Sequence, residues 1–109
     1  MKLSLAQIGR AMQAVGDFEN SQDLVASRVQ TDSRLVQPGD LFVCIAGQRF
    51  DGHNFAREAV HKGALAVVVE RPLLDLSSDV PMLLVQDSIQ ALADLASYWR
   101  RQFQGRVIA

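Results

Sequence analysis

Two uninterrupted apolar runs do most to limit what this chain can fold into. The first covers residues 41–46 (LFVCIA) and the second covers residues 64–69 (ALAVVV). A strand with one face in water alternates apolar and polar residues, whereas a run that is apolar at every position is typical of a strand buried on both faces. Such strands need a layer of helices on each side of the sheet. The two runs therefore favour an α/β fold with parallel strands.

Signals for helices and further strands surround the two runs. Ser4 is a candidate cap for a first helix that ends near Gly16, and Gly63 is placed to end a helix over residues 54–62. Residues 25–30 and 82–85 are predicted to form shorter strands. Asp87 and Gln90 form a capping-box pattern for a last helix. The inward faces expected from helical spacing are Leu5, Ile8, Met12 and Val15 in the first helix, Phe55, Ala59 and Val60 in the second, and Ile89, Leu92, Ala93, Ala96, Trp99 and Phe103 in the last.

These elements predict a small, three-layer-like α/β domain with a mixed, partly parallel sheet and about three helices. With 109 residues there is room for one core. The formal net charge of −1 indicates neither a nucleic-acid surface nor binding to an anionic membrane. One cysteine, Cys44, cannot form an internal disulfide, and no signal peptide or long apolar span is visible, so we expect a reducing cytoplasmic setting. Cys44 lies inside an apolar run and is expected to be buried and unreactive.

Two loops rich in polar groups follow predicted strands. Residues 31–34 (TDSR) combine hydroxyl, carboxylate and guanidinium groups, and residues 47–53 (GQRFDGH) add two glycines, a carboxamide, a second guanidinium and an aromatic ring. Ligands of α/β sheets usually bind at the carboxyl ends of the strands. We therefore expect both loops to contribute to one site for a polar ligand.

The residues alone leave structural roles open beside ligand binding. Thr31 and Ser33 are equally suited to bonding the local backbone, and the ring of Phe50 is suited either to stacking on a base or to filling the core. A structural ion pair between Asp32 and Arg34 is a further alternative. Asp51 is better placed to cap the following helix than to bind a ligand. His53 and His61 have no second carboxylate or cysteine at a metal-ligand spacing, so no metal site is predicted.

The order of motifs resembles the amino-terminal domain of the Mur ligases, which use ATP to form amide bonds in peptidoglycan precursors. The similar motifs are DSR at 32–34, PGDLFV at 38–43, G-x-x-x-DGH-x-F at 47–55 and GA-x-AVVV at 63–69. Two branches of the family share them: one adds the third residue of the stem peptide, and the other adds D-alanyl-D-alanine. Thr31 ahead of DSR, and the ending at residues 91–109, favour the second branch.

The resemblance also implies roles for single residues and partners. The implied ligand is the UDP-sugar part of a UDP-MurNAc-peptide, and no nucleic acid, membrane insertion, catalytic residue or metal ligand is expected. The matched positions that contact the UDP-sugar in the family are Thr31, Ser33, Gln48, Arg49 and Phe50, with Arg34 as a further candidate. The residues expected to order the loops are Asp32, Asp51, Gly52 and His53.

The end of the chain is predicted to begin a new element. Residues 106–109 (RVIA) have the composition of an apolar strand that stops without a turn or cap, as if a longer chain had been cut. The resemblance implies that residues 1–105 form the UDP-sugar-recognising domain, and that residues 106–109 lead into a central ATP-binding domain in the same chain.

No G-x-x-x-x-G-K-[ST] motif occurs in the sequence. ATP and Mg²⁺ are therefore expected to act elsewhere in the full-length parent, and the isolated fragment is predicted to be inactive. A binding or interaction module without catalysis is the alternative.

Overall fold

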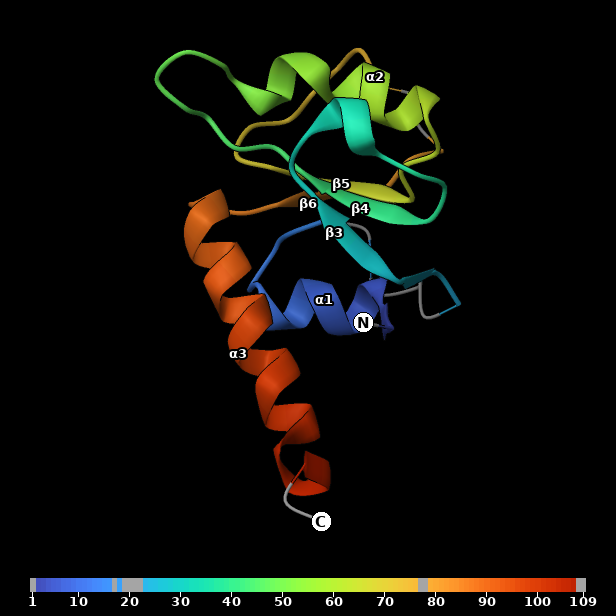
Figure 1. The fold of residues 1–109 in the computed structure, drawn as a ribbon. Helices are drawn as coiled ribbons and strands as arrows, with labels where there is room; N and C mark the ends of the chain where they lie inside the picture. The colour runs from blue at the N-terminus through green and yellow to red at the C-terminus, as the bar shows by residue number, and fades with distance from the viewer. Residues whose placement is uncertain (1, 17, 19–22, 77–78, 108–109) are drawn as a thin grey trace.

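The fold has three layers, with a parallel sheet between helices (Figure 1). The structure, a computed structural model, describes residues 2–16, 18, 23–76 and 79–107. In Figure 1, α2 lies on one side of the sheet and α1 and α3 lie on the other. The elements are β1 (Leu3–Ser4), α1 (Leu5–Ala11), β2 (Val25–Ala26), β3 (Arg28–Gln30), η1 (a 3₁₀ helix, Ser33–Leu35), β4 (Asp40–Val43), η2 (a 3₁₀ helix, Gly52–Phe55), α2 (Ala56–His61), β5 (Ala66–Val69), β6 (Met82–Leu84) and α3 (Ser88–Val107). The predicted α/β class is confirmed.

The central sheet has the strand order β3-β4-β5-β6, and every neighbouring pair is parallel. All residues of β4 and β5 are buried, as their continuous apolar runs predicted. Leu41 and Val43 pack on the side of α1 and α3, whereas Phe42 and Cys44 pack on the side of α2. The antiparallel part of the predicted mixed sheet is a separate pair, β1 with β2.

The first helix is correctly predicted at its start and wrongly at its end. The Ser4 side chain accepts from the backbone N–H of Gln7, and the Gln7 side chain accepts from the Ser4 N–H, which completes a capping box. The helix ends at Ala11, because Gln13 adopts a left-handed φ of 56° that no α-helix continues. Val15 is therefore 68% exposed instead of inward, and its backbone pairs with Leu84.

Two further predicted elements are divided in the structure. The strand expected over residues 25–30 is two strands, because β2 pairs with β1 while β3 joins the parallel sheet. The helix expected over residues 54–62 starts as η2 and becomes α-helical only at Ala56. As a result Phe55, which was predicted to point inward, is 37% exposed.

The last helix begins as expected but presents a different face to the core. Asp87 Oδ1 accepts from the N–H groups of Ile89 and Gln90, whereas the Gln90 side chain donates to Asp94 and does not complete the capping box. The buried positions are Ser88, Ala91 and Leu95, while Leu92 and Trp99 are partly buried against the core. Of the predicted inward positions, Ile89, Ala93 and Ala96 are exposed, and the side chain of Phe103 lies outside the described part of the chain.

The predicted strand at the end of the chain does not begin at Arg106. Arg106 and Val107 instead continue α3, which runs without a break from Ser88. Ile108 and Ala109 lie outside the described residues.

Candidate functional site

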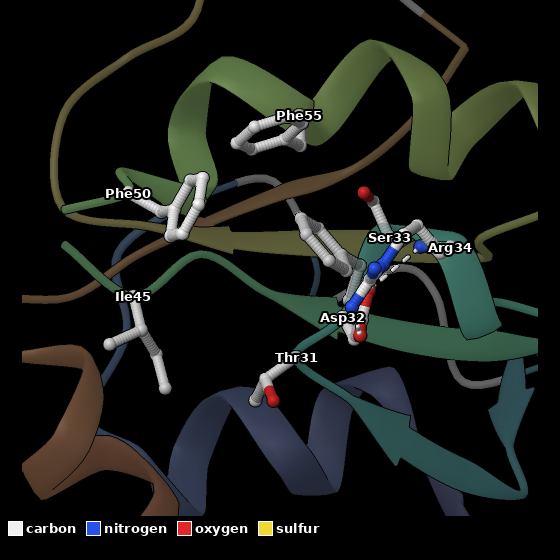
Figure 2. Close-up of a pocket in the computed structure, with 9 residues that line it drawn as sticks. Thr31, Asp32, Ser33, Arg34, Ile45, Phe50 and Phe55 are labelled. Carbon is white, nitrogen blue, oxygen red and sulfur yellow. Dashed lines mark hydrogen bonds and ion pairs between the residues drawn. The ribbon is translucent and has the colours of Figure 1, made fainter. Parts of the chain in front are cut away.

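The two polar loops lie next to each other at one edge of the sheet. The first follows β3 and the second follows β4, and these strands are parallel neighbours with Gln30 opposite Phe42. A cavity of about 500 Å³ lies between the loops, and Figure 2 shows its walls. It is lined by Thr31, Asp32, Ser33, Arg34, Phe42, Ile45, Phe50, Gly52 and Phe55. Residues of both loops therefore line one cavity, and the use of that cavity as a ligand site stays a prediction.

The first loop is shaped by an ion pair between Asp32 and Arg34. The Asp32 carboxylate accepts from the Arg34 backbone N–H and lies 2.8 Å from a guanidinium nitrogen of Arg34. The hydrogen bonds from the Arg34 side chain and backbone lower the pKa of Asp32 to about 2. The side chain of Arg34 is 79% exposed. The structural ion pair proposed from the sequence is present, and Arg34 still lines the cavity.

Bonds to α2 and to Gln30 hold the same loop from outside. The Ser33 hydroxyl donates to Glu58 Oε2 at 3.0 Å, instead of bonding the local backbone. Lys62 Nζ donates to the Arg34 carbonyl at 3.0 Å and lies 3.5 Å from Glu58 Oε1. The Gln30 side chain accepts from the N–H groups of Thr31 and Asp32. These contacts tie the loop to Gln30, Glu58 and Lys62 in the absence of a ligand.

A buried carboxylate supports the base of the first loop. Asp40 on β4 accepts two hydrogen bonds from the Arg28 guanidinium, at 2.7 and 3.1 Å, and Arg28 also donates to the Leu35 carbonyl. Burial raises the pKa of Asp40, but the bonds from Arg28 and from the Gln37 N–H outweigh it and leave the pKa below its ordinary value.

The second loop is much more open than the first. Gln48, Arg49 and Phe50 are all exposed, and only Phe50 lines the cavity. The loop closes through a 2.7 Å hydrogen bond from the Gly47 N–H to the Phe50 carbonyl. Phe50 is 70% exposed and does not fill the core; its ring lies 6.4 Å from that of Phe55, at 58° (Figure 2). The structure thus leaves Gln48 and Arg49 outside the cavity wall, next to its aromatic side.

The base of the second loop is organised by a buried histidine. His53 Nδ1 lies 2.6 Å from Asp51 Oδ1, and Nε2 accepts from the Glu70 backbone N–H at 2.8 Å. Because Nε2 is an acceptor, the proton lies on Nδ1 and is donated to Asp51. Both ring nitrogens of His53 are thus engaged in structure, which leaves neither for proton transfer.

Asp51 and Gly52 complete this base. Asp51 caps η2 by accepting from the His53 N–H, as predicted, and also lies 3.0 Å from an Arg71 nitrogen. The bonds from the backbone and ring of His53, followed by that from Arg71, lower the pKa of Asp51 to about 2. Gly52 passes so close to β4 that an added Cβ would lie 2.8 Å from the Ile45 nitrogen.

Cys44 lies below this loop and has no sign of reactivity. It is fully buried, and burial, followed by the nearby charge of Asp51, raises the pKa of its thiol to about 12. This agrees with the unreactive role predicted from its apolar neighbours.

Several residues that shape the site are not apparent from the sequence. They are Arg28, Asp40, Glu58, Lys62 and Glu70, and each acts on a loop residue distant in the chain or through the backbone. Among these residues, only Asp40 belongs to a local sequence pattern, the PGD turn. The Asp40 carboxylate accepts from the N–H of Gln37 within that turn.

Two kinds of feature are absent from the described part of the chain. Within residues 2–16, 18, 23–76 and 79–107, no three His, Cys, Asp or Glu side chains gather as metal ligands. No helix in these same residues combines the length and apolar character needed to cross a bilayer.

Comparisons with known proteins agree with the motifs. The family model "Mur ligase family, catalytic domain" matches residues 26–100. The chain is 44% identical over 87 residues to UDP-N-acetylmuramoyl-tripeptide--D-alanyl-D-alanine ligase from Escherichia coli (strain K12), a match that covers 80% of this chain and 19% of that protein. It is 43% identical over 95 residues to UDP-N-acetylmuramoyl-L-alanyl-D-glutamate--2,6-diaminopimelate ligase from Listeria monocytogenes, with 85% and 19% covered.

A solved structure shares the fold. The crystal structure of MurF from Acinetobacter baumannii superposes with a TM-score of 0.81 and 32% identity, covering 94% of this chain and 22% of that one. The chain spans about a fifth of the length of these relatives. Its motifs, fold and sequence identity lead to one conclusion: the chain belongs to the Mur ligase family.

Proposed function

We propose that this domain binds the UDP end of a UDP-MurNAc-peptide for a Mur ligase. The cavity between the two loops is the observation that carries the proposal. Its walls combine the rings of Phe42, Phe50 and Phe55 with the polar side chains of the first loop. A planar base needs an apolar surface to stack on, and the sugar and phosphates need hydrogen-bonding groups beside it.

The two loops would share the nucleotide between them. Ser33 and Thr31 line the cavity, whereas Arg49 is exposed beside its aromatic wall. A guanidinium suits a diphosphate because it can donate two parallel hydrogen bonds to phosphate oxygens. We therefore assign the nucleoside to the cavity and the diphosphate to the Arg49 side. The net charge of −1 makes such a local cation necessary.

The chemistry of the parent enzyme would take place outside this domain. The 109 residues contain no G-x-x-x-x-G-K-[ST] loop, which is the sequence motif that would bind the phosphates of ATP with their Mg²⁺. We assign both to a central domain in the same parent chain. Binding the remote end of a substrate still assists the reaction, because it fixes where the reacting carboxylate lies.

Among the Mur ligases, we propose that the parent adds D-alanyl-D-alanine to the tripeptide precursor. A structural match with a TM-score of 0.81 and relatives that carry this name favour it. The diaminopimelate-adding ligase (MurE) is the second candidate, since a relative of that name is 43% identical. We place the reaction in the cytoplasm, where the free thiol of Cys44 stays reduced.

A titration of the labelled domain with UDP tests the binding proposal. Amide signals of Thr31, Ser33, Gln48, Arg49 and Phe50 should shift together and saturate, because one nucleotide spans both loops. A labelled protein of similar size that has no nucleotide site, titrated with UDP in the same way, serves as the control for nonspecific shifts. A response confined to residues 71–81, or none at millimolar UDP with folded protein, would contradict the proposal and favour an interaction module.

The two candidate reactions can be separated with the full-length parent. Phosphate release with ATP, Mg²⁺ and the tripeptide precursor should depend on D-alanyl-D-alanine. Release that depends instead on the dipeptide precursor and a single amino acid would identify the MurE-type reaction. The isolated chain should release no more phosphate than a protein-free blank in either assay.

A further inference from the structure

The bond between Ser33 and Glu58 determines what kind of ligand atom Ser33 can meet. A serine hydroxyl has one proton to donate and two lone pairs that accept. That proton points to Glu58 Oε2 at 3.0 Å, and a carboxylate can only accept. The Ser33 side chain is also nearly buried, at the wall of the cavity. Toward the cavity it therefore offers lone pairs and no proton.

The surrounding charges also disfavour phosphate at this wall. Arg34 lies 2.8 Å from Asp32, and Lys62 lies 3.5 Å from Glu58, so each cation here already faces a carboxylate. Phosphate oxygens are acceptors and carry negative charge. At this wall they would face the lone pairs of Ser33 and the nearby carboxylates of Asp32 and Glu58, which is unfavourable. A neutral N–H or O–H group meets no such repulsion.

We propose that Glu58 is a positioning residue that makes Ser33 an acceptor for a donor group on the nucleoside, and not a contact for the diphosphate. This inference rests on the proposed UDP site. It specifies which part of the ligand is recognised by the wall that contains Ser33. UDP carries three neutral donors: the N3–H of uracil and the 2′ and 3′ hydroxyls of ribose. Ser33 would accept from one of these.

The test compares UDP with three analogues: 2′-deoxy-UDP and 3′-deoxy-UDP each lack one hydroxyl, and CDP has an accepting N3 in place of the N3–H and a 4-amino group in place of the 4-oxo group. The wild-type domain should bind one analogue about two- to tenfold more weakly than UDP, the range expected for one hydrogen bond. That analogue identifies the donor. In Ser33→Ala the same preference should shrink toward one, because the acceptor is gone.

Glu58→Ala separates positioning from simple structure. It removes the group that holds the Ser33 proton away from the cavity, so the lone pairs of the hydroxyl are no longer kept directed at the ligand, and the preference should again shrink while UDP still binds. Glu58→Gln keeps an oxygen that accepts from Ser33 and should retain most of the preference. Arg57→Ala changes an exposed neighbour on the same helix and serves as the matched control. A thermal melt of each variant checks that it is folded.

The outcomes distinguish this inference from the proposed function. If Ser33→Ala weakens UDP and all three analogues by one common factor, Ser33 contacts the diphosphate and the inference is wrong. Preferences that are unchanged in Glu58→Ala would also overturn it. If the folded wild-type domain binds neither UDP nor any analogue, the proposed function itself fails.

Discussion

The two loops of the cavity are built in different ways, although they follow neighbouring strands. The first loop is tied along its length, through Asp32 to its own backbone, through Ser33 to Glu58 and through the Arg34 carbonyl to Lys62. The second is tied at its base, by Asp51 and His53, while residues 48–50 are exposed. One wall of the cavity is therefore held by side-chain bonds along its length, whereas the other carries exposed side chains above a bonded base.

This difference separates residues that stabilise the fold from residues that would bind. In the second loop the stabilising contacts come from Asp51 and His53 at its base, whereas the candidate binding groups are the exposed residues 48–50. In the first loop one residue, Ser33, does both. Substitutions at the base of the second loop should therefore change stability most, and those at its exposed part should change stability least.

The largest effect is expected for His53→Ala. The substitution leaves the Glu70 N–H without its acceptor, removes a partner of Asp51 and opens a cavity where a side chain is fully buried. We expect a loss of roughly 2–4 kcal/mol in the free energy of unfolding, measured by urea denaturation.

His61→Ala is the matched control, because His61 is exposed at the end of α2. It should change the free energy of unfolding by no more than about 0.5 kcal/mol. Equal effects at the two histidines would show that the base of the second loop is not a source of stability.

Gly52→Ala should have the next largest effect. Its Cβ would lie 2.8 Å from the Ile45 nitrogen and 3.0 Å from the Cys44 Cα, both backbone atoms that cannot turn away. We expect a loss of roughly 1–3 kcal/mol, typical of overpacking, with amide shifts in residues 44–53. Gly47→Ala, where the nearest atom is the Phe50 oxygen at 3.1 Å, should cost less. The opposite order would mean that the open part of the loop is the more constrained.

Acid should weaken both loops, and the second more than the first. The pKa values of Asp32 and Asp51 are about 2 in the fold, below the value of about 3.9 in an unfolded chain. A depressed carboxyl pKa contributes stability above about pH 4 that is lost as the pH falls toward 2. Asp51→Asn keeps a capping side chain and should flatten the dependence of the melting temperature on pH in this window.

Asp32→Asn should flatten it less, because the Asp32–Arg34 pair is mostly in water and exposed pairs contribute little. Melting curves of both variants between pH 2 and 5 make the comparison. A steeper effect at Asp32 would reverse the ranking of the two loops.

The sequence predicts the parts of this molecule whose physical causes are local. Strands β4 and β5 were found because burial on both faces leaves a continuous apolar run, and the Ser4 cap was found because a serine stands directly before a run with helical spacing of apolar residues. The position of both loops follows from the alternation of strands and helices. The Asp51 cap likewise depends on a residue two positions away.

The features that were missed depend on contacts between distant residues. Ser33 and Glu58 are 25 positions apart, and His53 and Glu70 are 17 apart, so no local pattern indicates either bond. The inward face of α3 was predicted correctly at Leu92 and Trp99 but wrongly at Ile89, Ala93 and Ala96, because small and apolar residues surround the helix axis. Packing against α1, and not composition, determines that Leu95 is buried and Ala96 exposed.

The smallest effect on stability, and the sharpest separation of stability from binding, is expected for Phe50→Ala. The ring is 70% exposed and meets Phe55 at 6.4 Å in a tilted arrangement, so its loss should change the free energy of unfolding by no more than about 0.5 kcal/mol. If the ring stacks on uracil, the same substitution should weaken UDP binding by roughly 1–3 kcal/mol, as removing a stacked aromatic does elsewhere. Isothermal titration with UDP and urea denaturation of one protein sample measure both quantities. Phe50→Tyr keeps the stacking surface, so this variant should bind UDP with an affinity close to that of the wild type. A variant that binds UDP normally would assign the base to Phe55, and a variant that unfolds easily would show that the second loop is held from its exposed part after all.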